Sequence, residues 1–141
     1  MLNGSFWVKV HGGTTHFPIA LIIASMLFDL IGYALNREPY IRDLHMAAFY
    51  SLLLGALASF AAMLSGLIIS QWQVFGEGTL AKHHDFVWPA FALIVGLAVW
   101  RVVIRQRSSR RAYAAYLACS IVTAVLMATA GYWGGEMLLG G

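Results

Sequence analysis

The sequence is poor in charged residues. Of its 141 residues only 11% are charged, whereas 60% are hydrophobic, and the mean hydropathy is +0.74. A soluble domain carries about 25% charged residues. A chain this apolar would expose a large hydrophobic surface in water. The composition therefore excludes an ordinary soluble domain and predicts a membrane protein.

Cysteine is almost absent as well. The single cysteine, Cys119, lies inside an apolar run. One cysteine excludes an internal disulfide and a cysteine-based zinc site. A small packing role is the expected one.

Acidic residues are few, which leaves a net charge of +3 and a pI near 9.3. Such a balance can indicate a nucleic-acid partner. Here, however, five arginines crowd into the short stretch 101–111, between two apolar segments. Their position is typical of a membrane-orientation signal, so we expect no nucleic-acid partner.

What the chain has in abundance is long apolar segments. There are four, at residues 15–36, 41–70, 80–104 and 111–139. Each reaches the ~20 residues that a helix needs to cross a bilayer, and helices satisfy their own backbone groups there. The connections 37–40, 71–79 and 105–110 are short, which favours antiparallel neighbours. The sequence predicts one all-α domain, 1–141, an up-down-up-down four-helix membrane bundle. The first apolar segment is too long for a signal peptide.

Arginine also predicts the orientation. By the positive-inside rule the connection after the third segment is cytoplasmic, and the first connection, between Arg37 and Arg42, lies on the same side. Both termini and the 71–79 connection then face the periplasm. We expect a multi-pass protein of the bacterial inner (cytoplasmic) membrane.

Histidines are the most informative polar residues. His11, His16, His83 and His84 fall at the periplasmic level of the predicted bundle, and only His45 falls at the cytoplasmic level. Ionisable residues at membrane depth are rare and tend to be functional. The alternative is that each of them only reaches out to interfacial water.

Two helices carry small residues at spacings of four, three and four, which place each set on one helix face. The sets are Gly55, Ser59, Ala62 and Gly66, and Ala124, Ala128, Gly131 and Gly135. One interpretation is plain helix packing. The other is a flat slot for a haem, with axial histidines from the first and third helices.

The predicted axial pair is His16 with His84 or His83. Adjacent helical residues point about 100° apart, so only one of the latter two can face the core, and His84 is one residue deeper. His11 is a weaker candidate. The glycines expected to border the haem b are Gly66, Gly131, Gly134 and Gly135.

Other arrangements of the same side chains stay open. Zinc or copper could use the four outer histidines and Glu136, and a chain without any cofactor is a further alternative. Glu136 could also orient a ligand histidine by a hydrogen bond, or be solvated. Asp29 is expected to face inward and pair with His45 or Arg42, with a proton path as the alternative.

Short motifs carry a family resemblance. The run from His16 to Leu21 (His-Phe-Pro-Ile-Ala-Leu), followed by Asp29, resembles the opening of a bacterial family of small four-helix membrane proteins, known only as a domain of unknown function. Members also share a histidine at the start of helix three and a late Gly-Gly pair, here His83 or His84 and Gly134-Gly135. Many members have a His-Pro upstream, where this chain has His11-Gly12. The architecture is also similar to that of cytochrome b561-type haem proteins.

The expected function is a b-type haem-binding membrane subunit that carries electrons within or to a larger redox complex. Its partners would be membrane lipid and other membrane or periplasmic redox subunits, such as a c-type cytochrome, with quinone as a donor or acceptor. A chain this small with no soluble domain favours a non-catalytic subunit. A cofactor-free structural or assembly subunit, or a histidine-based zinc or copper site, is the alternative.

Overall fold

A computed structural model describes residues 2–35, 39–104 and 107–139. Within them the chain forms four helices, α1 (Leu2–Leu35), α2 (Tyr40–Ile69), α3 (Gly78–Ile104) and α4 (Arg110–Leu139). Each contains a stretch long and apolar enough to cross a membrane. The predicted all-α four-helix membrane bundle is confirmed.

The helix bounds differ from the predicted ones by one or two residues, except at the start of α1. That helix begins at Leu2, not near Thr15, and Pro18 lies in its interior. The hydroxyls of Thr14 and Thr15 donate to the carbonyls of His11 and Gly12, at 3.1 and 3.0 Å. The helix therefore brings His11 to the level of the bundle.

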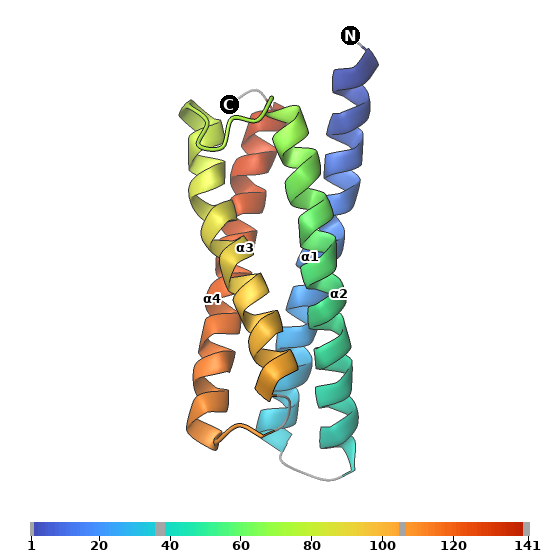
Figure 1. The fold of residues 1–141 in the computed structure, drawn as a ribbon, viewed down its shortest axis with the longest axis vertical. Coiled ribbons are helices and arrows are strands. Elements are labelled where there is room, and N and C mark those ends of the chain that lie inside the picture. The colour runs from blue at the N-terminus through green and yellow to red at the C-terminus, as the bar shows by residue number, and fades with distance from the viewer. Residues whose placement is uncertain (1, 36–38, 105–106, 140–141) are drawn as a thin grey trace.

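The helices form two pairs, in which α1 packs mainly on α2 and α3 on α4. The start of α1 and the end of α4 lie at the same end of the bundle, as Figure 1 shows. We call this the terminal end; it also carries the turn between α2 and α3. The opposite end, where α1 and α3 finish and α2 and α4 begin, is the arginine end.

The small-residue face of α2 packs closely on α1. A Cβ atom on Gly55 would lie 2.9 Å from Cδ1 of Ile22 and 3.2 Å from Cβ of Leu21. Ser59 and Ala62 on the same face are buried. The packing interpretation therefore explains this face along most of its length.

The predicted small-residue face of α4 is wrong by one position. Its buried face carries Tyr116, Ser120, Thr123, Met127 and Ala130. Ala128 and Gly131 are exposed, and a Cβ built on Gly131 or Gly135 would have no described atom within 4 Å apart from the neighbouring backbone of α4 itself. One residue turns a helix by about 100°, which is enough to move the predicted face out of the core.

The turn between α2 and α3 is anchored at the terminal end. Gln71 and Trp72 adopt left-handed backbone conformations, with φ of 53° and 63°. The indole N–H of Trp88 on α3 donates to the carbonyl of Val74, at 2.8 Å. The ring of Trp88 also lies 6.2 Å from that of His84, so this turn and the start of α3 are held together.

Candidate functional site

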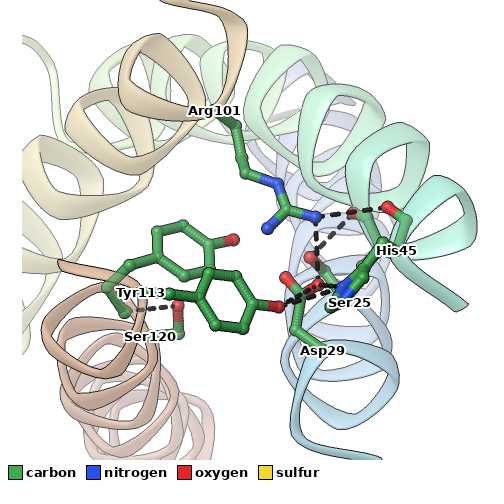
Figure 2. A network of polar contacts seen from close by, with 8 residues as sticks. Ser25, Asp29, His45, Arg101, Tyr113 and Ser120 are labelled. Atoms are coloured by element: carbon green, nitrogen blue, oxygen red, sulfur yellow. Dashed lines mark hydrogen bonds and ion pairs between the residues drawn. The ribbon is translucent and has the colours of Figure 1, made fainter. Parts of the chain in front are cut away.

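Asp29 is the centre of a polar network at the arginine end, drawn in Figure 2. Its side chain is 0% exposed. One carboxylate oxygen, Oδ1, accepts three hydrogen bonds, from a guanidinium nitrogen at 2.9 Å, an imidazole Nδ1 at 2.9 Å and a phenol at 2.7 Å; the donors are Arg101, His45 and Tyr113. Each of the four helices supplies one of these residues, so the network joins the two helix pairs.

Arg101 is held by more than its ion pair. The residue is 5% exposed, and the same nitrogen that contacts Asp29 also donates to the carbonyl of His45, at 3.2 Å. Its guanidinium lies over the rings of Tyr113 and Tyr116, 5.8 and 5.1 Å from their centroids. Aromatic faces attract cations, so the arginine charge has several partners.

One side chain of the network is partly exposed to solvent, and one buried oxygen has no hydrogen-bond partner among the described residues. The His45 side chain is 18% exposed. Its ring packs on α1, because a Cβ on Gly32 would lie 3.2 Å from its Cε1. Oδ2 of Asp29 is buried and has no hydrogen-bond partner among the described residues.

The predicted pairing of Asp29 with His45 is confirmed, whereas Arg42 is exposed. Arg101 and Tyr113 were not predicted as partners. Arg101 was counted with the exposed arginines of the connection, although Val102, Val103 and Ile104 separate it from Arg105. A buried carboxylate requires a partner, and an arginine inside an apolar segment was the available signal.

His11 is the first of three histidines that gather at the terminal end. Its Nδ1 lies 3.1 Å from the carbonyl of Ala62 and 2.9 Å from Oγ of Ser65, both on α2. A carbonyl can only accept, so Nδ1 carries the proton. A Cβ on Gly66 would lie 3.0 Å from Cε1 of the ring; this glycine makes room for the imidazole.

His83 is held in the same manner on the other helix pair. Its Nδ1 donates to the carbonyl of Ala130 on α4 at 2.8 Å, and a Cβ on Gly134 would lie 3.4 Å from its Cε1. His84 follows His83 on α3, and His11 lies at the same end of the bundle on α1. We call these three residues the histidine cluster.

His84 is the most deeply buried of the three, at 8% exposure. Its ring centroid lies 5.8 Å from that of His83. Its Nδ1 is buried without a hydrogen-bond partner among the described residues. Of the two neighbours on α3, His84 is the one enclosed by the bundle, while His83 lies against α4.

Helical spacing relates the two ends. Eighteen residues separate His11 from Asp29 on α1, and eighteen separate His83 from Arg101 on α3. Eighteen residues are five full turns, so each histidine has the azimuth of its charged counterpart, about 27 Å along the axis. Asp29 and Arg101 contact one another, whereas at the terminal end His11 contacts α2 and His83 contacts α4.

The structure does not bring His16 to this cluster. The residue is exposed. Five residues separate it from His11, which turns the helix by about 140°. Glu136 is half-buried and makes no hydrogen bond to a described histidine; the carbonyl of Ala130 takes the role that we predicted for it.

The cluster suits some ligands better than others. Among the described residues no three histidine, cysteine or carboxylate side chains are grouped so that they could hold a metal ion. The predicted zinc or copper alternative therefore has no support in this arrangement.

Comparison with known proteins places the chain in one family. A family profile described as "Predicted membrane protein (DUF2231)" matches residues 8–140. No curated protein and no solved structure matches the chain. The comparisons do not show the expected likeness to cytochrome b561-type proteins.

Proposed function

Because the chain belongs to the DUF2231 family of predicted membrane proteins, which has no assigned function, we propose its role from its own geometry. The protein is a membrane subunit that carries electrons on a b-type haem, held at the terminal end by His11 and His83. One observation carries this proposal. Two imidazoles from different helix pairs each have Nδ1 bound to a backbone carbonyl of the adjacent helix.

A hydrogen bond from Nδ1 to a carbonyl gives the histidine the tautomer that can coordinate iron through Nε2. When Nδ1–H is donated to a carbonyl, the lone pair of the neutral ring is on Nε2. Such a bond fixes the tautomer and the orientation of a metal-binding histidine. A haem held by two histidines supplies one-electron transfer without an open coordination position for substrate chemistry. His11 replaces His16 in the pair because His16 is exposed.

The number of ligands favours haem over zinc. A structural zinc site takes four protein ligands and a catalytic one takes three, whereas a haem needs two axial nitrogens. His84 is the alternative to His83 as the ligand from α3, since its buried Nδ1 has no described partner. The glycines proposed at the site are Gly66 and Gly134, which face the two rings.

The place of the histidines indicates where redox partners would approach. His83 lies five residues inside α3, about 8 Å from the start of that helix. A periplasmic c-type cytochrome, another subunit of a redox complex or a membrane quinone could reach this level from the terminal end. The arginine end is about 27 Å away, too remote to belong to the same site.

The orientation belongs to the same proposal. Exposed Arg42, Arg107, Arg110 and Arg111 lie at the arginine end, and positive residues favour the cytoplasm. The terminal end and both termini would then face the periplasm of a bacterial cell. Reporter fusions after Gly141 test this orientation. Activity of a reporter that works only in the cytoplasm would show that the orientation is the opposite one.

The haem is tested on the purified full-length protein by its pyridine haemochrome spectrum. We expect haem in the natural protein and its loss in His11→Ala and in His83→Ala. His16→Ala and His45→Ala are the matched controls and should retain it. Loss in His84→Ala, with retention in His83→Ala, would transfer the α3 ligand to His84. A natural protein isolated without haem, even after haem is added, would overturn the function.

A further inference from the structure

The arginine end carries a second site. We propose that Asp29 is a proton-binding site that exchanges protons with water at the arginine end through His45. This proposal does not depend on the haem, because it rests on other residues at the opposite end of the bundle. It concerns what the network does in addition to joining the helices.

The two oxygens of Asp29 have unequal surroundings. Oδ1 accepts three hydrogen bonds, while Oδ2 is buried with no described partner. An ionised carboxylate is stabilised when both oxygens accept hydrogen bonds, and a buried acceptor left unpaired is costly. A network built only to hold an anion would supply donors to both oxygens. With Oδ2 unpaired, the network stabilises the ionised carboxylate less fully than donors to both oxygens would.

When Asp29 is neutral, Arg101 still has other interaction partners. Arg101 still has the carbonyl of His45 at 3.2 Å and the faces of Tyr113 and Tyr116. These contacts do not require a charge on Asp29, and cation–π attraction is stronger away from water. The network can therefore hold Arg101 with Asp29 in either protonation state.

His45 is the connection to water. Its side chain is 18% exposed, whereas that of Asp29 is 0% exposed, and its Nδ1 lies 2.9 Å from Oδ1. Proton transfer is a simple exchange: Nε2 takes a proton from a hydronium ion in the water outside, Nδ1 releases its own proton to Oδ1, and the new Oδ1–H donates back to Nδ1. The imidazole ends neutral and the carboxyl gains one proton, so no other reactant is needed.

Each helix presents ionisable groups to this centre. Besides the residues already named, α1 presents Tyr33, whose ring lies 6.0 Å from that of Tyr113, and α4 presents Arg110, which donates to the Tyr33 hydroxyl at 3.3 Å. Asp43 on α2 is exposed near the same end. The histidine cluster is about 27 Å away, so the arginine end is the short route for a proton.

The test is infrared difference spectroscopy on the full-length protein in phospholipid vesicles. Lowering the pH should produce the carbonyl stretch of a protonated carboxyl group. We expect this band to shift when aspartate is labelled with ¹³C, to disappear in Asp29→Asn and to persist in Asp43→Asn. The isotope shift in the natural protein keeps the test valid if Asp29→Asn does not fold.

The route is tested by kinetics. After a pH jump, the Asp29 band should appear at least tenfold more slowly in His45→Gln, with the same final amplitude, because the exposed relay is lost. His16→Gln, on the exposed surface of α1, is the control and should match the natural protein. An Asp29 that stays ionised at every pH where the protein is folded would overturn the site. An unchanged rate in His45→Gln would overturn the route.

Discussion

The two ends of this bundle use similar residues in different ways. Both polar clusters draw on all four helices, and they lie about five helical turns apart. At the arginine end, Asp29, His45, Arg101 and Tyr113 bind one another through their side chains. At the terminal end, His11 and His83 are held by backbone carbonyls of adjacent helices, and not by each other.

This difference distinguishes a network that stabilises the packing of the helices from a cluster that can bind a cofactor. Opposite charges that satisfy each other join α1 and α2 to α3 and α4. Histidines that use only Nδ1 for their own positioning keep Nε2 for a ligand. The terminal end is therefore the place for a cofactor, whereas the arginine end joins the helices and, as proposed above, binds a proton.

Removing one charge at the arginine end should have the largest effect. Arg101→Leu leaves Asp29 buried without its cation, and breaking a buried pair costs about 3–5 kcal/mol. We expect a correspondingly large loss in the free energy of unfolding, measured in detergent micelles. Asp29→Asn together with Arg101→Leu should recover part of it, and Arg111→Ala at the exposed start of α4 should change nothing measurable. A single Arg101→Leu variant as stable as the natural protein would show that the ends do not differ in this way.

Two glycines allow a direct comparison of the ends. Gly32 faces the ring of His45 and Gly66 faces that of His11; added Cβ atoms would lie at 3.2 and 3.0 Å. Overpacking costs about 1–3 kcal/mol. Because His45 is fixed by Asp29 and Tyr113, its ring cannot move away, and Gly32→Ala should lower the free energy of unfolding more than Gly66→Ala does. Gly66→Ala should instead reduce haem content, measured by the same haemochrome spectrum.

The control for both is Gly131→Ala. Apart from the neighbouring backbone of α4, no described atom lies within 4 Å of its added Cβ, and replacing a glycine in a helix by alanine gains roughly 0.5–1 kcal/mol. We expect unchanged haem content and slightly higher stability. If Gly32→Ala and Gly66→Ala lowered stability equally, in a protein that never binds haem, we would conclude that both glycines serve only the close packing of helices.

The smallest expected effect concerns Ser65. Its Oγ lies 2.9 Å from Nδ1 of His11, but the carbonyl of Ala62 is a second acceptor at 3.1 Å. Ser65→Ala should therefore cost about 0.5–1.5 kcal/mol of stability and leave haem content intact. Complete haem loss in this variant would mean that the hydroxyl, and not the carbonyl, positions the ring.

The sequence by itself determined the number of helices, their antiparallel order and, except at the start of α1, their bounds to within two residues. These follow from hydropathy, because an apolar run of about 20 residues has only one stable backbone state in a bilayer. It also identified the polar residues that matter, since Asp29 and the histidines stand out against an apolar background. The shared level of these residues predicted that Asp29 pairs with His45 or Arg42, and the structure selected His45.

Tertiary structure decided which way each of these residues faces. A shift of one residue turns a helix by about 100°. For this reason His11 is in the cluster and His16 is outside it. Of the three glycines expected at the site on α4, Gly134 faces a histidine ring, whereas Gly131 and Gly135 do not. The partner of Asp29 across the bundle, Arg101, was likewise hidden among arginines of the same connection. The hydropathy pattern of the sequence indicates how deep in the membrane a residue lies, but the packing of neighbouring helices decides which way its side chain faces.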